Sequence, residues 1–403
     1  MVIPRGSKVN ESRKLLDLWL PPDGAGRPIA CLATTFTFDP DFFEGDCLAR
    51  FLGLSWKRGE GEDLAFLIDQ EERLVGVHTT VVVDRSLNPE GRSLRWDVLP
   101  VGLRGGVQHA KVTLLVWDRL VRVIVSSANL TTNGYRSNAE IATALDAFEG
   151  SELPVSLFGD LLDGLGRLVS QSPADGGRQG PKQRALETLR DASQRIRGFG
   201  LPDRGRNDLR LSAVFCEPGR PALQQLDAVW RGGPARFAMV LSPFFDAEDG
   251  AKKTVAGLMK RLTQRGDVAV EFAVPVNTRM GKAVVQAPAV LRSAAPKRVE
   301  LTFRTFQEEA EELRHLHAKA IIFESDEWAA LLVGSSGPAS KKWTLEEARG
   351  RVTRCWYEGA EEVQPGVQSG GGEAGEGGRS QARGDCAGPG YSVRHAAAVE
   401  AAG

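Results

Sequence analysis

The chain has 403 residues, of which 42% are hydrophobic and 26% charged, and its formal net charge is −1. This is enough for one large domain or two medium ones, and it excludes a protein that binds nucleic acid through overall charge alone. Five scattered cysteines form no CxxC pair, and no apolar leader or run of about 18 apolar residues occurs, so we expect a cytoplasmic protein that does not span a membrane.

The first part of the chain predicts strands interrupted by two helices. We expect one helix at 39–52, with Asp39 as its N-cap and Pro40 at its first position, and another at 153–171. Apolar, β-branched runs predict strands at 28–38, 64–68, 75–83, 94–101, 110–117, 121–127 and 140–147.

A second block follows a loop that is rich in Gly, Pro and Gln (172–183) and a polar helix at 185–199. Helices are expected at 250–266 and 281–294. Strands are expected at 209–217, 236–242, 267–276, 298–306, 318–324 and 329–336. Beyond about Glu358 the chain is Gly-rich with few apolar residues, which predicts disorder because it cannot offset its conformational entropy.

The two blocks resemble each other. The segment TTFTFDPDFFEGD (34–46) parallels MVLSPFFDAEDG (239–250), and HAKVTLLV (109–116) parallels HAKAIIFE (317–324). Each HAK strand is followed by an apolar strand that ends in Ser-Ser. We therefore predict an α/β protein of two tandem repeats. The expected divisions are an N-terminal extension (1–28), a first repeat (29–170), a linker with a polar helix (171–208), a second repeat (209–345) and a Gly-rich tail (346–403).

The paired HAK motifs indicate a site for an anion. On a strand, residues i and i+2 share a face, so each His should project beside its Lys. If the repeats pack about a pseudo-twofold axis, both pairs meet in one cleft that suits a phosphate. The expected donors of further hydrogen bonds are Ser126, Ser127 and Asn129, with Ser335 and Ser336 in the matching places of the second repeat.

Two imidazoles in one anion site favour a divided mechanism. One histidine attacks phosphorus and forms a phosphohistidine, while the other donates a proton to the leaving oxygen and then activates water. Such a scheme needs no metal and no cofactor. Spacing alone leaves open which histidine has which role.

These residues resemble the phospholipase D superfamily, whose motif is H-x-K, an Asn about 18–20 positions later, and often N-x-E. Here the motif comprises His109, Lys111, Asn129 and the segment Asn138-Ala139-Glu140. In motif style the chain is closest to the tyrosyl-DNA phosphodiesterase branch, and the resemblance covers about residues 29–340. It implies two repeats, each a mixed sheet flanked by helices.

The resemblance also implies roles for individual residues. His109 would be the nucleophile and His317 the general acid. Lys111, Lys319 and Asn129 would hold the phosphate, and Glu140 would orient a histidine ring.

The second motif departs from this pattern, because Gly337-Pro338 stands where the second Asn is expected. Proline offers no side-chain amide and no backbone N–H. One hypothesis is a change of reading frame near Ser336, which reading the gene's other two frames would test. The other is natural degeneration to a weakened enzyme.

The predicted function is a metal-independent phosphodiesterase that acts on DNA or RNA, as a nuclease or in DNA end processing. One alternative is a phospholipase D-type hydrolase of phospholipids, and another is a non-catalytic module that binds nucleic acid or phosphate. Residues 250–300 contain ten Lys or Arg and three Asp or Glu, which fits either solvated helix faces or a track for a nucleic-acid backbone. A metal site at His315, His317 and His109 is a further, weaker hypothesis. The site needs only a monomer, and the oligomeric state is left open.

Overall fold

The structure is a computed structural model. It describes residues 14–54, 63–87, 93–103, 106–173, 180–205, 210–216, 225–226, 230, 233–245, 248–279, 282–285, 287–305 and 314–335. The predictions for Ser336, Pro338 and the tail at 346–403 lie outside these residues.

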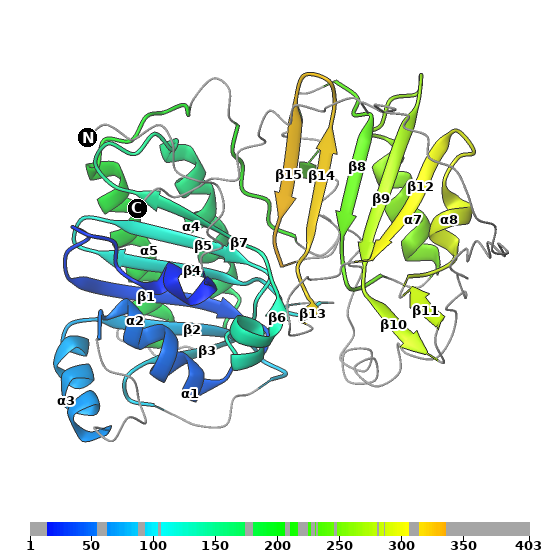
Figure 1. Ribbon diagram of the computed structural model, residues 1–403. Helices are drawn as coiled ribbons and strands as arrows, with labels where there is room; N and C mark the ends of the chain where they lie inside the picture. Colours follow the sequence, from blue (N-terminus) through cyan, green and yellow to red (C-terminus); the bar gives the residue numbers. More distant parts are fainter. Residues whose placement is uncertain are drawn as a thin grey trace, which may run out of the picture.

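The first repeat is built on a six-stranded mixed sheet (Figure 1). Its strands are β1 (Pro28–Thr35), β2 (His78–Asp84), β3 (Asp97–Val101), β4 (Val112–Trp117), β5 (Val121–Ser126) and β7 (Ala142–Ala147). Their order across the sheet is β3-β2-β1-β4-β5-β7. The neighbours β1, β2 and β3 run parallel, whereas β4 is antiparallel to both β1 and β5.

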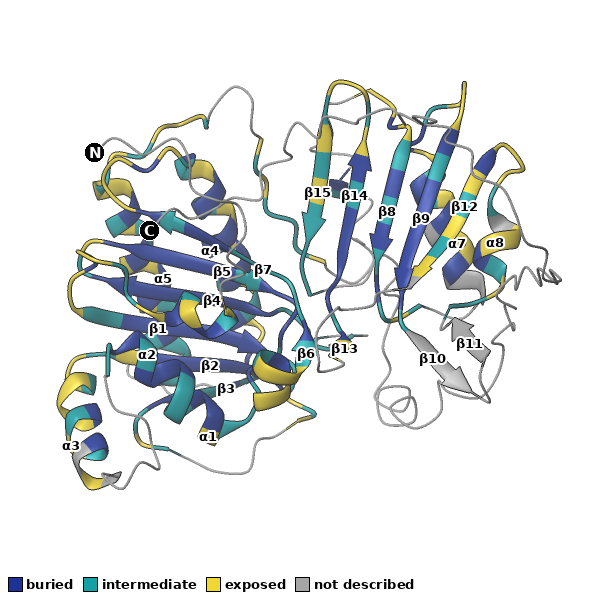
Figure 2. Cartoon of the chain, viewed as in Figure 1, coloured by how far each residue is buried: buried dark blue, intermediate teal, exposed yellow. Residues whose placement is uncertain are grey.

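Both faces of this sheet are covered. Leu32 points to one face, and its neighbours Cys31 and Ala33 point to the other, as the two-residue period of a strand requires. The Leu32 face packs on α4 (Val155–Ser170) and α5 (Pro181–Gly198). The opposite face is covered by a 3₁₀ helix (Leu15–Trp19), α1 (Pro40–Phe42), a π-helical turn (Phe43–Leu48) and α2 (Ala49–Phe51). In Figure 2 the central strands are accordingly buried.

The second repeat has a sheet with the same strand order. Its strands are β8 (Phe237–Leu241), β9 (Val268–Val274), β12 (Val299–Thr305), β14 (Ala320–Glu324) and β15 (Ala329–Val333). They are ordered β12-β9-β8-β14-β15, which matches β3-β2-β1-β4-β5 strand for strand. The parallel and antiparallel pairings also match. The predicted class, two tandem α/β repeats with mixed sheets, is confirmed.

One face of the second sheet packs on α7 (Glu248–Met259) and α8 (Val290–Ala294). Phe272 and Phe323 are fully buried there, with Val255 and Leu258 of α7 in the same cluster. A hairpin of β10 (Val276–Arg279) and β11 (Lys282–Val285) follows β9. No helix in the described part of the chain is long and apolar enough to cross a membrane.

The packing bears on the proposed domain boundaries. The helix expected in the linker, α5, contributes Ala185, Leu189 and Ala192 to the core of the first sheet. Trp19, placed in the expected N-terminal extension, is fully buried against the other face. We therefore propose a first domain that extends from the 3₁₀ helix to the end of α5.

Three expected elements were wrong. Residues 64–68 belong to α3 (Asp63–Leu74), in which Phe66 and Gln70 are buried one helical turn apart. A short apolar run fits a strand or a helix equally well, and only the polar residues that follow decide between them. Residues 210–216 form no strand, although Leu211 and Phe215 pack on the first core. The helix expected at 281–294 is strand β11 and then the short α8.

The repeats meet at a short parallel pairing between β6 (Asn138–Ala139) and β13 (His315–Leu316). The backbone N–H groups of His317 and Ala318 both donate to the carbonyl of Ala139, at 2.9 and 2.8 Å. This junction brings the segment after β5 of one repeat against the segment before β14 of the other (Figure 1).

Candidate active site

Each HAK motif lies just before a central strand rather than on it. His109 and Lys111 precede β4, and His317 and Lys319 precede β14. We expected these residues on the strands themselves, and the structure places them immediately before; the Lys111 Nζ nevertheless lies beside the His109 ring, as expected. In the first repeat the motif is held by Thr34, whose hydroxyl donates to the carbonyl of Ala110 at 2.9 Å and accepts from the Val112 N–H at 2.8 Å.

His109 is held by a contact from the opposite repeat. Its Nδ1 lies 3.1 Å from the carbonyl oxygen of Ser335. A carbonyl oxygen only accepts, so this hydrogen bond forms in the tautomer that carries the proton on Nδ1, and in that tautomer Nε2 keeps a lone pair. The Lys111 Nζ lies beside the ring, 3.1 Å from Nδ1 and 3.2 Å from Nε2, and it also donates to the His109 carbonyl at 3.1 Å.

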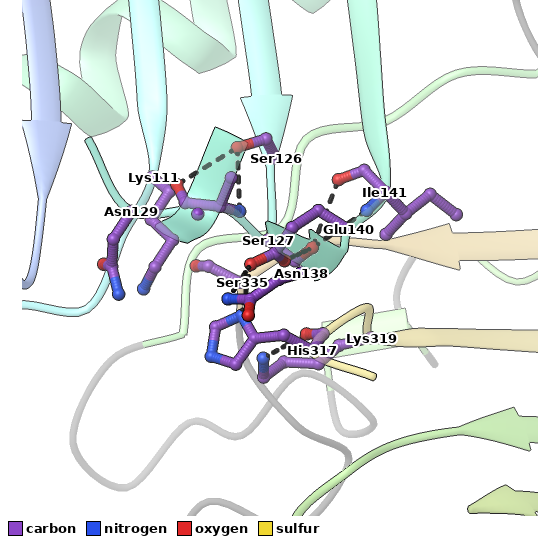
Figure 3. A network of polar contacts seen from close by, with 12 residues as sticks. Lys111, Ser126, Ser127, Asn129, Asn138, Glu140, Ile141, His317, Lys319 and Ser335 are labelled. Carbon is purple, nitrogen blue, oxygen red and sulfur yellow. Dashed lines mark hydrogen bonds and ion pairs between the residues drawn. The ribbon is translucent and has the colours of Figure 1, made fainter. Parts of the chain in front are cut away.

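His317 is held in the reciprocal way by Glu140 of the first repeat. Its Nδ1 lies 2.7 Å from Glu140 Oε1, and the glutamate side chain is only 4% exposed. The carboxylate is itself fixed, because Ser127 Oγ donates to Oε2 and Asn138 Nδ2 donates to Oε1 at 3.2 Å. Figure 3 shows this chain of contacts running from Ser127 through Glu140 to His317.

Two lysine ammonium groups are buried at the site. Lys111 and Lys319 are each 3% exposed. Burial lowers the pKa of Lys319 to about 8, although the charge of Glu140 opposes the shift. Burial and the charge of Lys319 hold the pKa of Lys111 well below its ordinary value. Two cations that repel each other out of water are stabilised when an anion binds between them.

The pKa values of the two histidines are displaced by different amounts. Burial, then the charges of Lys111 and Lys319, hold the pKa of His109 well below 6.5. Burial also lowers the pKa of His317, but the hydrogen bond to Glu140 and its charge oppose that shift. Near neutral pH His109 therefore has its lone pair available, and of the two rings His317 keeps a proton more readily. Such a separation of pKa values is what an acid and a nucleophile need.

Asn129 has its side-chain amide oriented by the backbone. Its Oδ1 accepts from the N–H groups of Phe36 and Thr37, both at 3.3 Å. Because those groups only donate, the amide oxygen faces them and the NH₂ points away from them. In Figure 3 the Asn129 and Lys111 side chains extend in the same direction, toward the side on which His317 and Lys319 lie.

The four expected serines have different surroundings. Ser126 Oγ is hydrogen-bonded to the backbone of Ala128, and Ser127 Oγ is hydrogen-bonded to Glu140 and to the backbone of Ile141. Both hydroxyls, which we expected to bind the phosphate, therefore already have partners within the protein. Ser335 contacts His109 through its carbonyl oxygen. Ser336 lies outside the described residues. The structure thus brings together Lys111, Asn129, Glu140, His317 and Lys319 around His109.

Comparisons with known proteins gave only distant likenesses. No protein-family model and no curated protein matches the chain. A mutant form of yeast tyrosyl-DNA phosphodiesterase matches with a TM-score of 0.42 and 9% identity, over 81% of this chain and 80% of that one. The yeast enzyme itself matches with a TM-score of 0.41 and 10% identity, over 76% and 75%. Polyphosphate kinase from Porphyromonas gingivalis matches with a TM-score of 0.36 and 10% identity, over 80% of this chain and 42% of that one.

Sequence reasoning missed four residues that shape the site. Thr34 bridges the HAK backbone, and Gly134 lets the chain pass close to Asn129. Phe36 and Phe244 each lie beside one histidine ring, with centroids 5.2 and 5.7 Å apart. In the sequence these two rings were indicated only by the phenylalanines that follow the first strand of each repeat, Phe36 and Phe38 after β1 and Phe244 and Phe245 after β8.

The hypothesis of a metal site at His315, His317 and His109 has little support, and His78 lies away from the site. Nδ1 of His317 is on Glu140, and the described residues contain no group of three His, Cys, Asp or Glu suited to a metal. His78 is exposed at the start of β2. The first HAK motif contacts Thr34 near the end of β1, and because β1 and β2 run parallel, the two strand ends lie at opposite edges of the sheet.

Proposed function

We propose that the protein is a metal-independent phosphodiesterase that acts on a nucleic-acid strand through a phosphohistidine. One observation carries the proposal. Each histidine has its Nδ1 held by an acceptor from the opposite repeat, which leaves both Nε2 atoms for chemistry beside two buried ammonium groups. Because both rings are oriented in this way, the arrangement supports a mechanism in which both imidazoles react rather than one.

In the first step, Nε2 of His109 attacks phosphorus. A P–N bond forms while the bond from phosphorus to the leaving oxygen breaks, and His317 gives its Nε2 proton to that oxygen. The negative diester screens the lysines and so favours the protonated form of His317 at the moment when it must act as an acid.

In the second step, water attacks the phosphorus of the phosphohistidine. Neutral His317 takes a proton from the water through Nε2, the P–N bond breaks, and His109 is restored. His317 is again protonated, so the cycle closes without a further reactant.

The charge that builds up on the phosphoryl oxygens is stabilised by groups that are already in place. Lys111 and Lys319 supply charge, and the Asn129 NH₂ supplies a directed donor. When a phosphate enters, its oxygens replace the His109 ring as the partner of the Lys111 ammonium, and Nε2 is freed to attack. Ser127 acts indirectly, by fixing Glu140.

A nucleic acid is favoured by the surface of the second repeat. Exposed cations occur along α7 and the loops beside it: Lys252, Lys253, Lys260, Arg265 and Lys297. Such a surface binds a polyanionic backbone by releasing counterions, so the KM for a DNA strand should rise with salt while the KM for a small diester should change little.

The test uses a labelled single-stranded oligonucleotide and bis(p-nitrophenyl) phosphate in excess EDTA. We expect the wild type to cleave both. His109→Ala should lower cleavage of the oligonucleotide by about 10³-fold or more, and His317→Ala by a similar factor. His78→Ala serves as the matched control and should retain full activity.

The alternatives give different results. Salt-sensitive binding without turnover indicates a binding module, and cleavage of phospholipid vesicles but not of DNA indicates a lipid hydrolase. Loss of all activity in EDTA contradicts the phosphohistidine scheme.

A further inference from the structure

The aromatic ring of Phe244 is unusually placed for an apolar side chain. It is the third residue after β8, and 48% of the residue is exposed. Its centroid is 5.7 Å from that of the His317 ring, with the planes nearly perpendicular at 80°. The Lys319 Nζ lies 5.3 Å from the same centroid. A large exposed ring therefore lies beside the histidine and the buried lysine of the second repeat.

The ring is held in position by the backbone beneath it. Ser242, fully buried, donates through Oγ to the carbonyl of Phe244 at 2.8 Å and accepts from the Phe244 N–H at 3.3 Å. The next residue, Phe245, turns inward and packs on Phe272 with centroids 6.0 Å apart. Of two adjacent phenylalanines, one thus anchors the loop in the core and the other is kept at the surface.

The first repeat offers only a partial counterpart. Phe36 follows β1 and lies 5.2 Å from the His109 ring, but it is half-buried and tilted by 44°. The more open aromatic surface therefore belongs to the His317 side, which is the side of the leaving group under the proposed function.

We propose that Phe244 is a specificity-determining residue that stacks on a nucleobase of the strand, next to the scissile phosphate on the leaving-group side. The inference rests on the proposed function for the position of that phosphate. A nucleobase is planar, and its polarisable face gains from contact with an exposed ring beside a cation. The stack turns the leaving oxygen toward His317, so it favours substrates that carry a base at this position.

The test compares two oligonucleotides that are identical except that one has an abasic tetrahydrofuran residue on the leaving-group side of a single cleavable phosphodiester. We expect the wild type to cleave the base-bearing strand with a kcat/KM about 10–50-fold higher, the size of one base–aromatic stack. Phe244→Ala should abolish this preference, because it should lower kcat/KM about 10–50-fold more for the base-bearing strand than for the abasic strand. Phe244→Trp should keep the preference.

Binding of both strands, measured by fluorescence anisotropy, separates the two proposals. If binding depends on the base and on Phe244 but no strand is cleaved, the stacking of Phe244 on a base is supported and the proposed phosphodiesterase activity is contradicted. If cleavage occurs but Phe244→Ala lowers kcat/KM equally for both strands, the ring only supports His317 and Lys319, and the stacking proposal is overturned. A wild type that does not distinguish the strands overturns it as well.

Discussion

The two histidines share a sequence motif but not an environment. His109 donates to the neutral carbonyl of Ser335, whereas His317 lies against the carboxylate of Glu140. A neighbouring negative charge favours the protonated ring, and a carbonyl does so only weakly. We base the proposed roles on this difference: His109 as the nucleophile and His317 as the acid, which are also the roles that the family resemblance implies.

The same difference predicts how activity depends on pH. The proposed reaction needs His109 without a proton on Nε2 and His317 with one. The pKa of His109 lies well below 6.5, and that of His317 is lowered less, so kcat/KM should be highest in the mildly acidic range. It should fall as pH rises through the pKa of His317, and fall again near pH 8, where Lys319 loses its proton.

Glu140→Gln gives this prediction a directional check. Removing the carboxylate charge lowers the pKa of His317 further, so the first fall in kcat/KM should move to lower pH while the limb set by His109 stays nearly in place. Rate profiles of both proteins on the labelled oligonucleotide measure the shift. A profile that rises steadily to pH 9 in the wild type, or an unshifted limb in the variant, would contradict the assignment.

At the scale of elements, the site depends on where strands end. β1 and β8 deliver Phe36 and Phe244, and β5 leads into the turn that carries Asn129. That turn closes through a π-helical segment (Asn133–Ser137), in which a Cβ at Gly134 would come within 2.4 Å of the Asn129 carbonyl oxygen. Only a residue without a side chain lets the two backbones approach so closely.

Gly134→Ala should therefore displace Asn129 rather than simply loosen the fold. The new methyl group would clash with the backbone of Asn129, so the clash is relieved only if Asn129 moves. We therefore expect kcat to fall by about 10-fold or more. KM should change less, since the lysines still bind the phosphate. Gly159→Ala, in α4 with open space at the Cβ position, is the matched control and should leave kcat unchanged. Circular dichroism shows whether both variants fold; a folded Gly134→Ala with full activity would refute this role for the glycine.

The sequence was sufficient for some elements and not for others. Asp39 caps α1 as expected, because its side chain accepts from the Phe42 N–H at 3.2 Å, a purely local contact. The run at 64–68 was misread because its apolar residues fit either period. Residues 210–216 show a strand-like alternation, since Leu211 and Phe215 do face the core, but they pair with no strand in the part of the chain that the structure describes. Whether an extended segment becomes a strand depends on the sheet edge that it meets.

At the scale of the whole molecule, each repeat supplies the group that orients the histidine ring of the other repeat. Glu140 of the first repeat orients His317 of the second, and the Ser335 carbonyl of the second orients His109 of the first. Matching strand orders could be expected from the paired HAK motifs. The crossed contacts could not, because they depend on the docking of the two repeats through β6 and β13. Neither repeat alone contains a complete site.

The most direct test of the central claim is to trap the phosphoryl group on His109. With bis(p-nitrophenyl) phosphate the leaving nitrophenolate needs no proton, so His317→Ala should still perform the first step but hydrolyse the intermediate slowly. The account predicts a burst of about one equivalent of nitrophenolate per protein and an acid-labile adduct on His109, found by mass spectrometry of rapidly quenched peptides. His109→Ala should give neither. A burst that survives in His109→Ala, or steady turnover by His317→Ala without any adduct, would contradict the account.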